Sequence, residues 1–221
     1  MSFEGFPDDG LVFYEGLEAD NSKTYWTQHK AAYEAHVRGP LLALLEELAP
    51  EFGTAKVFRP YRDVRFSHDK TPYKTHQGAV VHADGHGTGA WYLQISAEGL
   101  HVSGGSWRLE SDQVARYRRA VADSVQGPRL QAEVDRLVRA GWGLRGDTLT
   151  RVPAGYPADA ERLELLKHKS LHMSRDWEPA DWLHDRRALE EVRTAWRDLR
   201  TLNAWLADNV GATSKEPRAR R

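Results

Sequence analysis

The chain has 221 residues, of which 40% are hydrophobic and 29% charged, a composition typical of a soluble globular protein with a sizeable core. Its formal net charge of −1 gives no electrostatic basis for bulk nucleic-acid or membrane binding, so an anion site must be a local patch. It has no cysteine, which excludes disulfides, thiol catalysis and cysteine-ligated zinc or iron–sulfur centres.

The first fifty residues are predicted to be helical. Hydrophobic spacing indicates a helix over 9–19, capped by Asp8, and a second helix that opens at Asn21 or Ser22. Gly39-Pro40 is expected to break the second helix. Pro40 then suits the start of a third helix, which Pro50 ends.

From Lys56 the pattern changes to the two-residue alternation of strands. Four strands are expected, over 57–67, 78–82, 91–96 and 100–103, the last two joined by a turn at 97–99. This succession predicts an antiparallel meander.

The second half returns to helices with one more small piece of sheet. Helices are expected over 112–124, 128–140 and 159–167, a small hairpin over 142–150, a strand over 170–173 and a long amphipathic helix over 186–209. The predicted fold class is therefore α+β: an antiparallel sheet with N-terminal helices and a long C-terminal helix packed on it. We expect a single domain over 1–211 and a flexible polar tail over 212–221.

The most informative segment is 56–78, which holds three Arg, three Lys, two Asp and two His inside the predicted sheet. Charge in a strand is costly unless it faces water, a partner or a ligand. Alternation divides the strand into two faces. One face carries Arg59, Tyr61, Asp63 and Arg65. The other reads as core, with Arg62 as an exception or as the sign of a bulge near Pro60.

Clustered cations of this kind suit a phosphate or carboxylate, which Arg binds through two parallel hydrogen bonds. Asp63 and His76 are weak candidates for acid–base roles. Trp107 is added because it follows the Gly104-Gly105 turn after the last hairpin, where a shared cleft could form. The candidate ligand-binding residues are Arg59, Arg62, Arg65, Lys70, Tyr73, Lys74 and Trp107.

Two other patterns are weaker. His82, Asp84 and His86 could bind a divalent metal, but the loop is glycine-rich and no further protein side chain of the right kind is evident nearby, so no metal site is predicted. Residues 103–107 could hold an anion on backbone N–H groups, yet a turn that needs a positive φ explains the two glycines more simply.

The segment also carries a resemblance. Its core reads Arg62-Asp63-Val64-Arg65-Phe66-Ser67, followed by Asp69-Lys70-Thr71-Pro72-Tyr73-Lys74-Thr75-His76. With Asn21 and Trp26 upstream, and 91–95, 104–107, 149–156 and 165–169 downstream, it resembles a widespread bacterial family catalogued as domain of unknown function 2461. The resemblance spans about residues 6–207. His68 departs from it, standing where a Lys is expected.

The resemblance implies a stand-alone intracellular bacterial protein and supplies no catalytic residues or cofactor. The first ten residues have no basic region followed by an apolar run, so we expect no signal peptide and a cytoplasmic location. No stretch approaches the roughly 18 apolar residues of a membrane span, so no membrane partner is expected, and the four-residue Arg218–Arg221 tail is too short to indicate nucleic-acid binding.

Three functional hypotheses stay open. The first is a protein, enzymatic or not, that binds a small anionic ligand at a basic cleft on 56–78. The second is a non-enzymatic module that binds a protein or a nucleic acid through the same patch. The third is a purely structural ion-pair network that fixes strand register. The sequence distinguishes none of them, and it does not indicate a cofactor or an oligomeric state.

Overall fold

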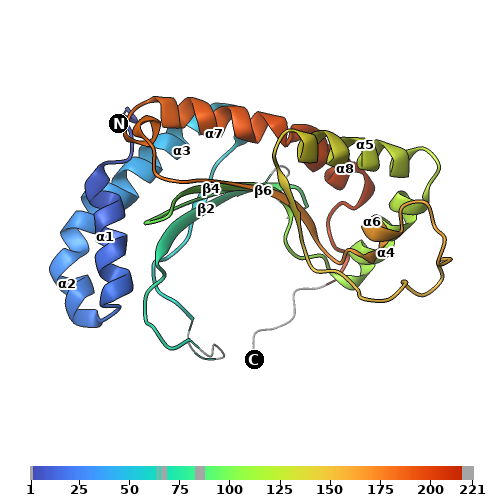
Figure 1. The fold of residues 1–221 in the computed structure, drawn as a ribbon, viewed down its shortest axis with the longest axis horizontal. Helices are drawn as coiled ribbons and strands as arrows, with labels where there is room; N and C mark the ends of the chain where they lie inside the picture. Colours follow the sequence, from blue (N-terminus) through green and yellow to red (C-terminus); the bar gives the residue numbers. More distant parts are fainter. Residues whose placement is uncertain (1, 64, 66–68, 83–87, 216–221) are drawn as a thin grey trace. The chain divides into compact units, whose positions relative to one another are not determined.

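The computed structural model describes residues 2–63, 65, 69–82 and 88–215. Its sheet has six strands in the order β1-β2-β3-β4-β6-β5, antiparallel as predicted (Figure 1). The strands are β1 (Lys56–Val57), β2 (His76–His82), β3 (Ala90–Ser96), β4 (Gly99–Ser106), β5 (Gly143–Arg145) and β6 (Leu171–Trp177). The α+β class is confirmed.

The chain divides into two compact units. The first comprises residues 1–81, 92–102 and 176–195, and the second 82–91, 103–175 and 196–221, within the described ranges. Each unit takes part of β3, β4 and β6. That residues 1–211 form a single domain stays a prediction.

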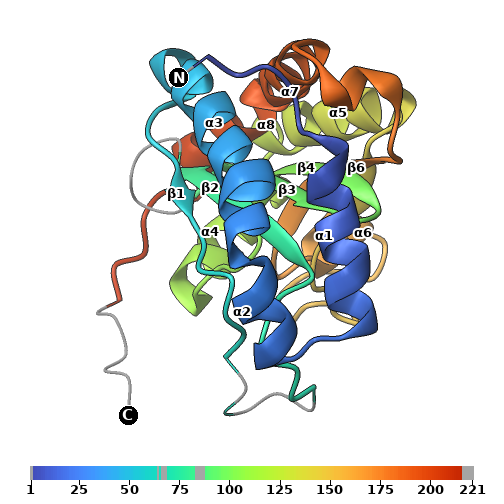
Figure 2. The ribbon, with the colours of Figure 1, turned by 90° about the vertical axis from the view of Figure 1, so that its left-hand side faces the viewer.

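The first unit opens with four helical segments, seen face-on in Figure 2. They are α1 (Asp8–Ala19), α2 (Lys23–Ala32), the π-helix η1 (Tyr33–Arg38) and α3 (Gly39–Phe52). The Ser22 hydroxyl caps α2 by accepting from the Tyr25 N–H, 3.1 Å away. A 3-10 helix, η2 (Asp181–His184), and the start of α7 (Arg187–Asp198) complete the unit.

The predicted break at Gly39-Pro40 is wrong. The chain passes from η1 into α3 with helical backbone angles throughout, and Pro40 stands in the first turn of α3. The Gly39 N–H donates to the Glu34 carbonyl, five residues back, which is the hydrogen bond of a π-helix. The helix therefore continues past Pro40, although Pro40 has no N–H to donate.

In the first unit the strands bury one face of the sheet. Ala79, Leu93, Ile95, Leu100 and Val102 are almost fully buried. The alternate residues Tyr92, Gln94, Ser96 and His101 are only half-buried. Because successive strand residues point to opposite faces, the first unit has a polar sheet face opposite its apolar core.

The second unit contains α4 (Ser111–Ala122), α5 (Gln126–Arg139), α6 (Leu163–Lys167) and α8 (Arg200–Asn209). Its core includes Tyr117, whose hydroxyl donates to the Leu165 carbonyl over 2.9 Å. The expected helix over 186–209 is instead two helices, α7 and α8, separated at Leu199.

The predicted hairpin over 142–150 is also wrong. β5 pairs with β6, Gly143 opposite Ser174, while Thr148 forms an isolated bridge with His168. Gly146, at φ +134°, explains the turn, because a Cβ there would lie 2.1 Å from the Ser170 carbonyl oxygen. Because of this close approach, the residues after Gly146 run beside residues 168–170 and do not fold back to pair with residues 143–145.

Candidate functional site

The segment 56–78 forms two antiparallel arms, but little of it is regular strand. Only Lys56–Val57 belong to β1, so the strand predicted over 57–67 is wrong. Beyond it, the arms are joined by the hydrogen bonds Arg62 N–H to Pro72 O (2.9 Å) and Lys74 N–H to Pro60 O (2.8 Å). Pro60 has no N–H, which prevents a continuous ladder.

The two predicted faces nevertheless differ in exposure. Arg59, Tyr61, Asp63 and Arg65 are exposed, whereas Arg62 is half-buried. An extended chain alternates its side chains whether or not it is paired, so the exposure pattern does not depend on the ladder. Val64, Phe66, Ser67 and His68 lie outside the described residues.

A bulge lies opposite Pro60, on the second arm and not on the arm of Pro60 where one was expected. Phe58 N–H bonds Gly78 O (3.0 Å) and Lys74 N–H bonds Pro60 O, so only Arg59 lies between the bonded positions on one arm, while residues 75–77 lie between them on the other. The extra residues include His76. Bulges redirect side chains and often occur beside functional sites.

Gln77 fixes this bulge from the buried side. The side chain is 1% exposed and its amide nitrogen donates to Phe58 O (2.7 Å) and Gly78 O (3.1 Å). Its amide oxygen accepts from the Tyr33 hydroxyl at 2.6 Å. The Gln77 side chain thus replaces backbone hydrogen bonds that the bulge interrupts.

Tyr73 attaches the second arm to the helices. Its ring stacks on Trp26, with centroids 4.4 Å apart and planes 8° from parallel, and it is 5% exposed. Asn21 bonds the Tyr73 backbone twice, accepting from its N–H (3.1 Å) and donating to its carbonyl (3.0 Å). The structure therefore places Tyr73 in the core, where it supports the arm.

Two of the predicted arginines pair with carboxylates in the same segment. Arg65 binds Asp63 through two hydrogen bonds of 3.0 and 2.7 Å, which hold the pKa of the Asp63 carboxyl far below its usual range. Arg62 contacts Asp69 at 2.6 Å. These pairs match the hypothesis of a structural ion-pair network, and they reduce the set of cations available to a ligand.

Arg59, Lys74 and His76 are different. None of the three forms an ion pair with a carboxylate in the described part of the chain. The Lys74 ammonium lies 5.3 Å from the centre of the Phe58 ring, and Lys70 is exposed at the turn. The three unpaired side chains come together because the Arg59 arm runs antiparallel to the bulged arm that carries Lys74 and His76.

Their electrostatics show mutual repulsion. Partial burial, and then the charges of Arg59 and Arg62, lower the pKa of Lys74. Burial, and then the charges of Lys74, Arg62 and His101, lower the pKa of His76 to about 4. His76 is therefore neutral at pH 7, and the cluster favours the arrival of negative charge.

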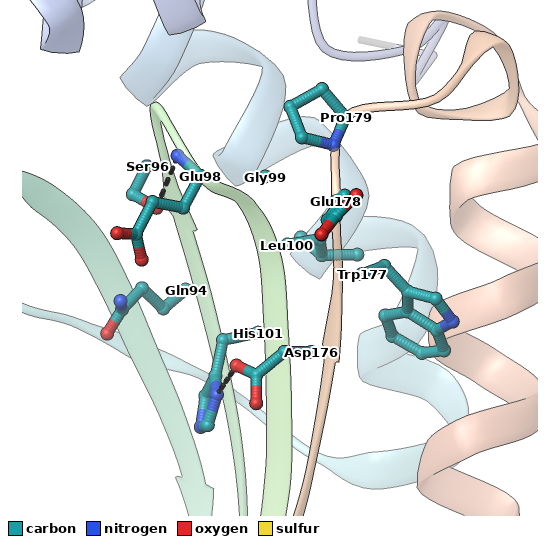
Figure 3. Close-up of a pocket in the computed structure, with 10 residues that line it drawn as sticks. All are labelled: Gln94, Ser96, Glu98, Gly99, Leu100, His101, Asp176, Trp177, Glu178 and Pro179. Atoms are coloured by element: carbon teal, nitrogen blue, oxygen red, sulfur yellow. Dashed lines mark hydrogen bonds and ion pairs between the residues drawn. The ribbon is translucent and has the colours of Figure 1, made fainter.

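A pocket of about 610 Å³ lies on the polar sheet face of the same unit (Figure 3). It is lined by Gln94, Ser96, Glu98, Gly99, Leu100, His101, Asp176, Trp177, Glu178 and Pro179. His101 on β4 and Asp176 on β6 form a hydrogen bond of 2.6 Å between Nδ1 and Oδ1. The pocket therefore carries a histidine–carboxylate pair.

Tyr92 links the cations to this pocket. Its ring lies 6.3 Å from Phe58 on one side and 5.8 Å from His101 on the other, and its hydroxyl donates to Gln94 Oε1 over 2.7 Å. Gly78 leaves room for that hydroxyl, since a Cβ there would lie 2.5 Å from it. Burial raises the pKa of Tyr92 to about 12.

The remaining sequence candidates lie elsewhere or outside the described residues. Trp107 belongs to the second unit, where its ring centroid lies 5.4 Å from that of His172. Gly105 takes φ +134° against Leu171 O, which is the simpler explanation of the glycine pair. Asp84 and His86 are not described, and no group of His, Asp or Glu in the described ranges could hold a metal ion.

The pocket residues were missed by sequence reasoning. None of the seven predicted ligand-binding residues is among those that line the pocket in the described chain. The alternation over 91–96 could have indicated Tyr92 and Gln94 as partners on one sheet face. Asp176 gave no such signal, because it is 75 residues from His101.

Comparison with known proteins adds the family. Among the described residues no helix is long and apolar enough to cross a membrane. No curated protein matches the sequence. The sequence model of the conserved hypothetical protein family DUF2461 matches residues 9–205, which includes the whole 56–78 segment and the pocket. The chain therefore belongs to the DUF2461 family.

Proposed function

We propose that this protein binds a small anionic ligand, bearing a phosphate or a carboxylate, at Arg59, Lys74 and His76. The observation that carries the proposal is that these three side chains share one bulged segment without a carboxylate partner in the described residues. Arg62 and Arg65, which the sequence also suggested, already have Asp69 and Asp63 as partners.

The electrostatics support an anion rather than a neutral ligand. Lys74 and His76 lose affinity for protons partly because neighbouring cations repel the added charge. An anion between them reverses this repulsion and raises both pKa values. Binding should therefore be accompanied by proton uptake and should weaken as salt concentration rises.

The neighbouring pocket favours a small molecule. Its volume of about 610 Å³ lies in the range of small-ligand sites. The Tyr92 ring lies between this pocket and Phe58, over which Lys74 lies, so the cations and the pocket belong to neighbouring parts of one sheet face. A binding module for a macromolecule would not need this pocket.

Thermal shift and calorimetry with inorganic phosphate, citrate and acetate test the proposal. At a ligand concentration ten times Kd, binding adds about 1.4 kcal/mol to the free energy of unfolding, which raises Tm by roughly 3–6 °C in a chain of this size. The variants Arg59→Ala and Lys74→Ala should lose this shift. Lys30→Ala, at an exposed position on α2, should keep it.

Two results would contradict the proposal. One is an equal anion-induced shift in the wild type and in both the Arg59→Ala and Lys74→Ala variants. The other is no shift with any anion, together with oligonucleotide binding whose affinity falls steeply with salt, which is the expected behaviour of a nucleic-acid-binding module.

A further inference from the structure

The pocket of the first unit carries one histidine whose hydrogen bonding defines its chemistry. His101 Nδ1 lies 2.6 Å from Asp176 Oδ1, and a carboxylate only accepts, so Nδ1 donates. In the neutral ring Nε2 is then the proton acceptor. Figure 3 shows that this second nitrogen points away from Asp176. The His101 side chain is 28% exposed, so a ligand could reach it.

We infer that His101 is a general base for a ligand bound in this pocket, with Asp176 as its positioning residue. The inference rests on the proposed function. It specifies a substrate that carries a phosphate or carboxylate for Arg59 and Lys74 and, at its other end, a hydroxyl or amine directed at His101. The Tyr92 ring, 5.8 Å from His101, separates the two ends.

The step is a proton transfer. The substrate O–H or N–H bond breaks, its electron pair stays on the substrate atom, and the proton forms a new bond to His101 Nε2. The Asp176 carboxylate offsets the positive charge that the ring acquires. The same proton returns to the substrate or to product later in the cycle, so no oxidant or reductant is needed.

Among the titratable groups near the pocket, His101 is the one best suited to accept a proton from the substrate. His76 on β2 has its pKa lowered to about 4 and is a poorer base at neutral pH. Tyr92 on β3, with its pKa raised to about 12, keeps its proton and can only donate. Glu98 and Glu178 also line the pocket, and carboxylates are weaker bases than imidazole.

The experiment measures the reactivity of each histidine toward diethyl pyrocarbonate, which acylates neutral imidazole, by mass spectrometry at pH 8. His29 is the matched control. It is exposed, and its Nδ1 contacts a neutral acceptor, the Tyr25 carbonyl, at 2.9 Å. His101 should be labelled at least as fast as His29 although it is less exposed. Asp176→Ala should slow the labelling of His101, because the ring loses the carboxylate that accepts from Nδ1 and supports the basicity of Nε2, and should leave His29 unchanged.

The inference is overturned if Asp176→Ala leaves the His101 rate unchanged, or if His101 is labelled far more slowly than His29. Asp176 is 74% exposed, so its removal should not prevent folding, and a melting curve verifies this. The phosphate-induced thermal shift, measured on the same samples, separates the two proposals. Loss of the shift in Arg59→Ala, with the expected labelling of His101, supports both proposals. Absence of the shift in the wild type, with the expected labelling, removes the anion site and with it the anionic substrate, and leaves only the reactivity of the His101–Asp176 pair.

Discussion

The bulge at residues 75–77 gives His76 unusual surroundings for a histidine on a sheet. Two neighbouring cations, Arg62 and Lys74, and partial burial disfavour its protonated form. A neutral imidazole beside an arginine and a lysine can still accept a hydrogen bond or donate one before an anion arrives. A bound anion then raises the pKa of His76 and favours its protonated form.

The same surroundings predict a pH dependence of stability. The folded-state pKa of His76, about 4, is below the unfolded value of about 6.5, so the unfolded chain binds the extra proton between these values. The free energy of unfolding should therefore fall as pH drops from 6.5 to 4, by about 1 kcal/mol after allowance for solvent screening. His76→Gln should flatten this interval in urea titrations. His29→Gln, at an exposed position, should not, and an equal slope in wild type and His76→Gln would contradict the assignment.

At the scale of elements, signals contained in a few neighbouring residues predicted helices well and strand pairing less well. The Ser22 cap and the apolar spacing of α1 are contained in a few residues, and the presence of helices there was predicted correctly. The predicted Asp8 cap is wrong, because α1 begins at Asp8 itself, after Pro7, and has no side-chain cap. The side chains predicted to alternate over 57–67 do alternate in exposure where the structure describes them. An extended chain shows this alternation even when it is not hydrogen-bonded to a neighbour. The pattern therefore could not show that only Lys56–Val57 form a regular strand.

Contacts between residues far apart in the sequence could not be predicted from local patterns. The partner of β5 is β6, which begins more than twenty residues later, and nothing in 142–150 indicates this. The candidate site shows the same limit. Arg59, Lys74 and His76 stand close in sequence and were found, while the His101–Asp176 pair joins residues 75 positions apart and was not.

The bulge itself can be tested through Gln77. Replacing it by Leu removes three hydrogen bonds and leaves the Phe58 carbonyl and the Tyr33 hydroxyl without their partner in a buried place. Gln77→Leu should lower the free energy of unfolding by about 2–3 kcal/mol, measured by urea denaturation. Gln28→Leu, on the exposed side of α2, should change it by less than about 0.5 kcal/mol. A cost at Gln77 no greater than at Gln28 would show that the amide does not hold the bulge.

At the scale of the whole molecule, the near-zero net charge conceals an uneven use of charge. Among the described residues, most arginines that form an ion pair contact a carboxylate near in sequence, as Arg65 and Arg187 do with Asp63 and Asp185. In the 56–78 segment, Arg59 and Lys74 lie near one another, and neither forms an ion pair with a carboxylate in the described residues. The closeness of the two cations, more than their lack of ion pairs, is what supports the proposed anion site.

Local neutralisation also predicts how the whole molecule responds to acid. In the first unit, hydrogen bonds from Arg186, Arg65 and Arg187 lower the carboxyl pKa values of Glu47, Asp63 and Asp185. In the second unit, backbone N–H groups lower those of Asp112 and Asp123. Each group adds stability above its unfolded pKa, near 4, that is lost as pH falls through the lower folded value.

Tm should therefore fall more steeply below pH 4 than between pH 6.5 and 4, and His76→Gln should leave this lower interval unchanged. The double variant Asp63→Asn/Asp112→Asn should be less stable at pH 7 but should lose less on acidification, because two of the groups that take up protons on unfolding are gone. Calorimetry at pH 7, 5, 4 and 3 measures both slopes. A Tm that stays level from pH 4 to pH 3 in the wild type would mean that these carboxylates are equally satisfied in the unfolded chain.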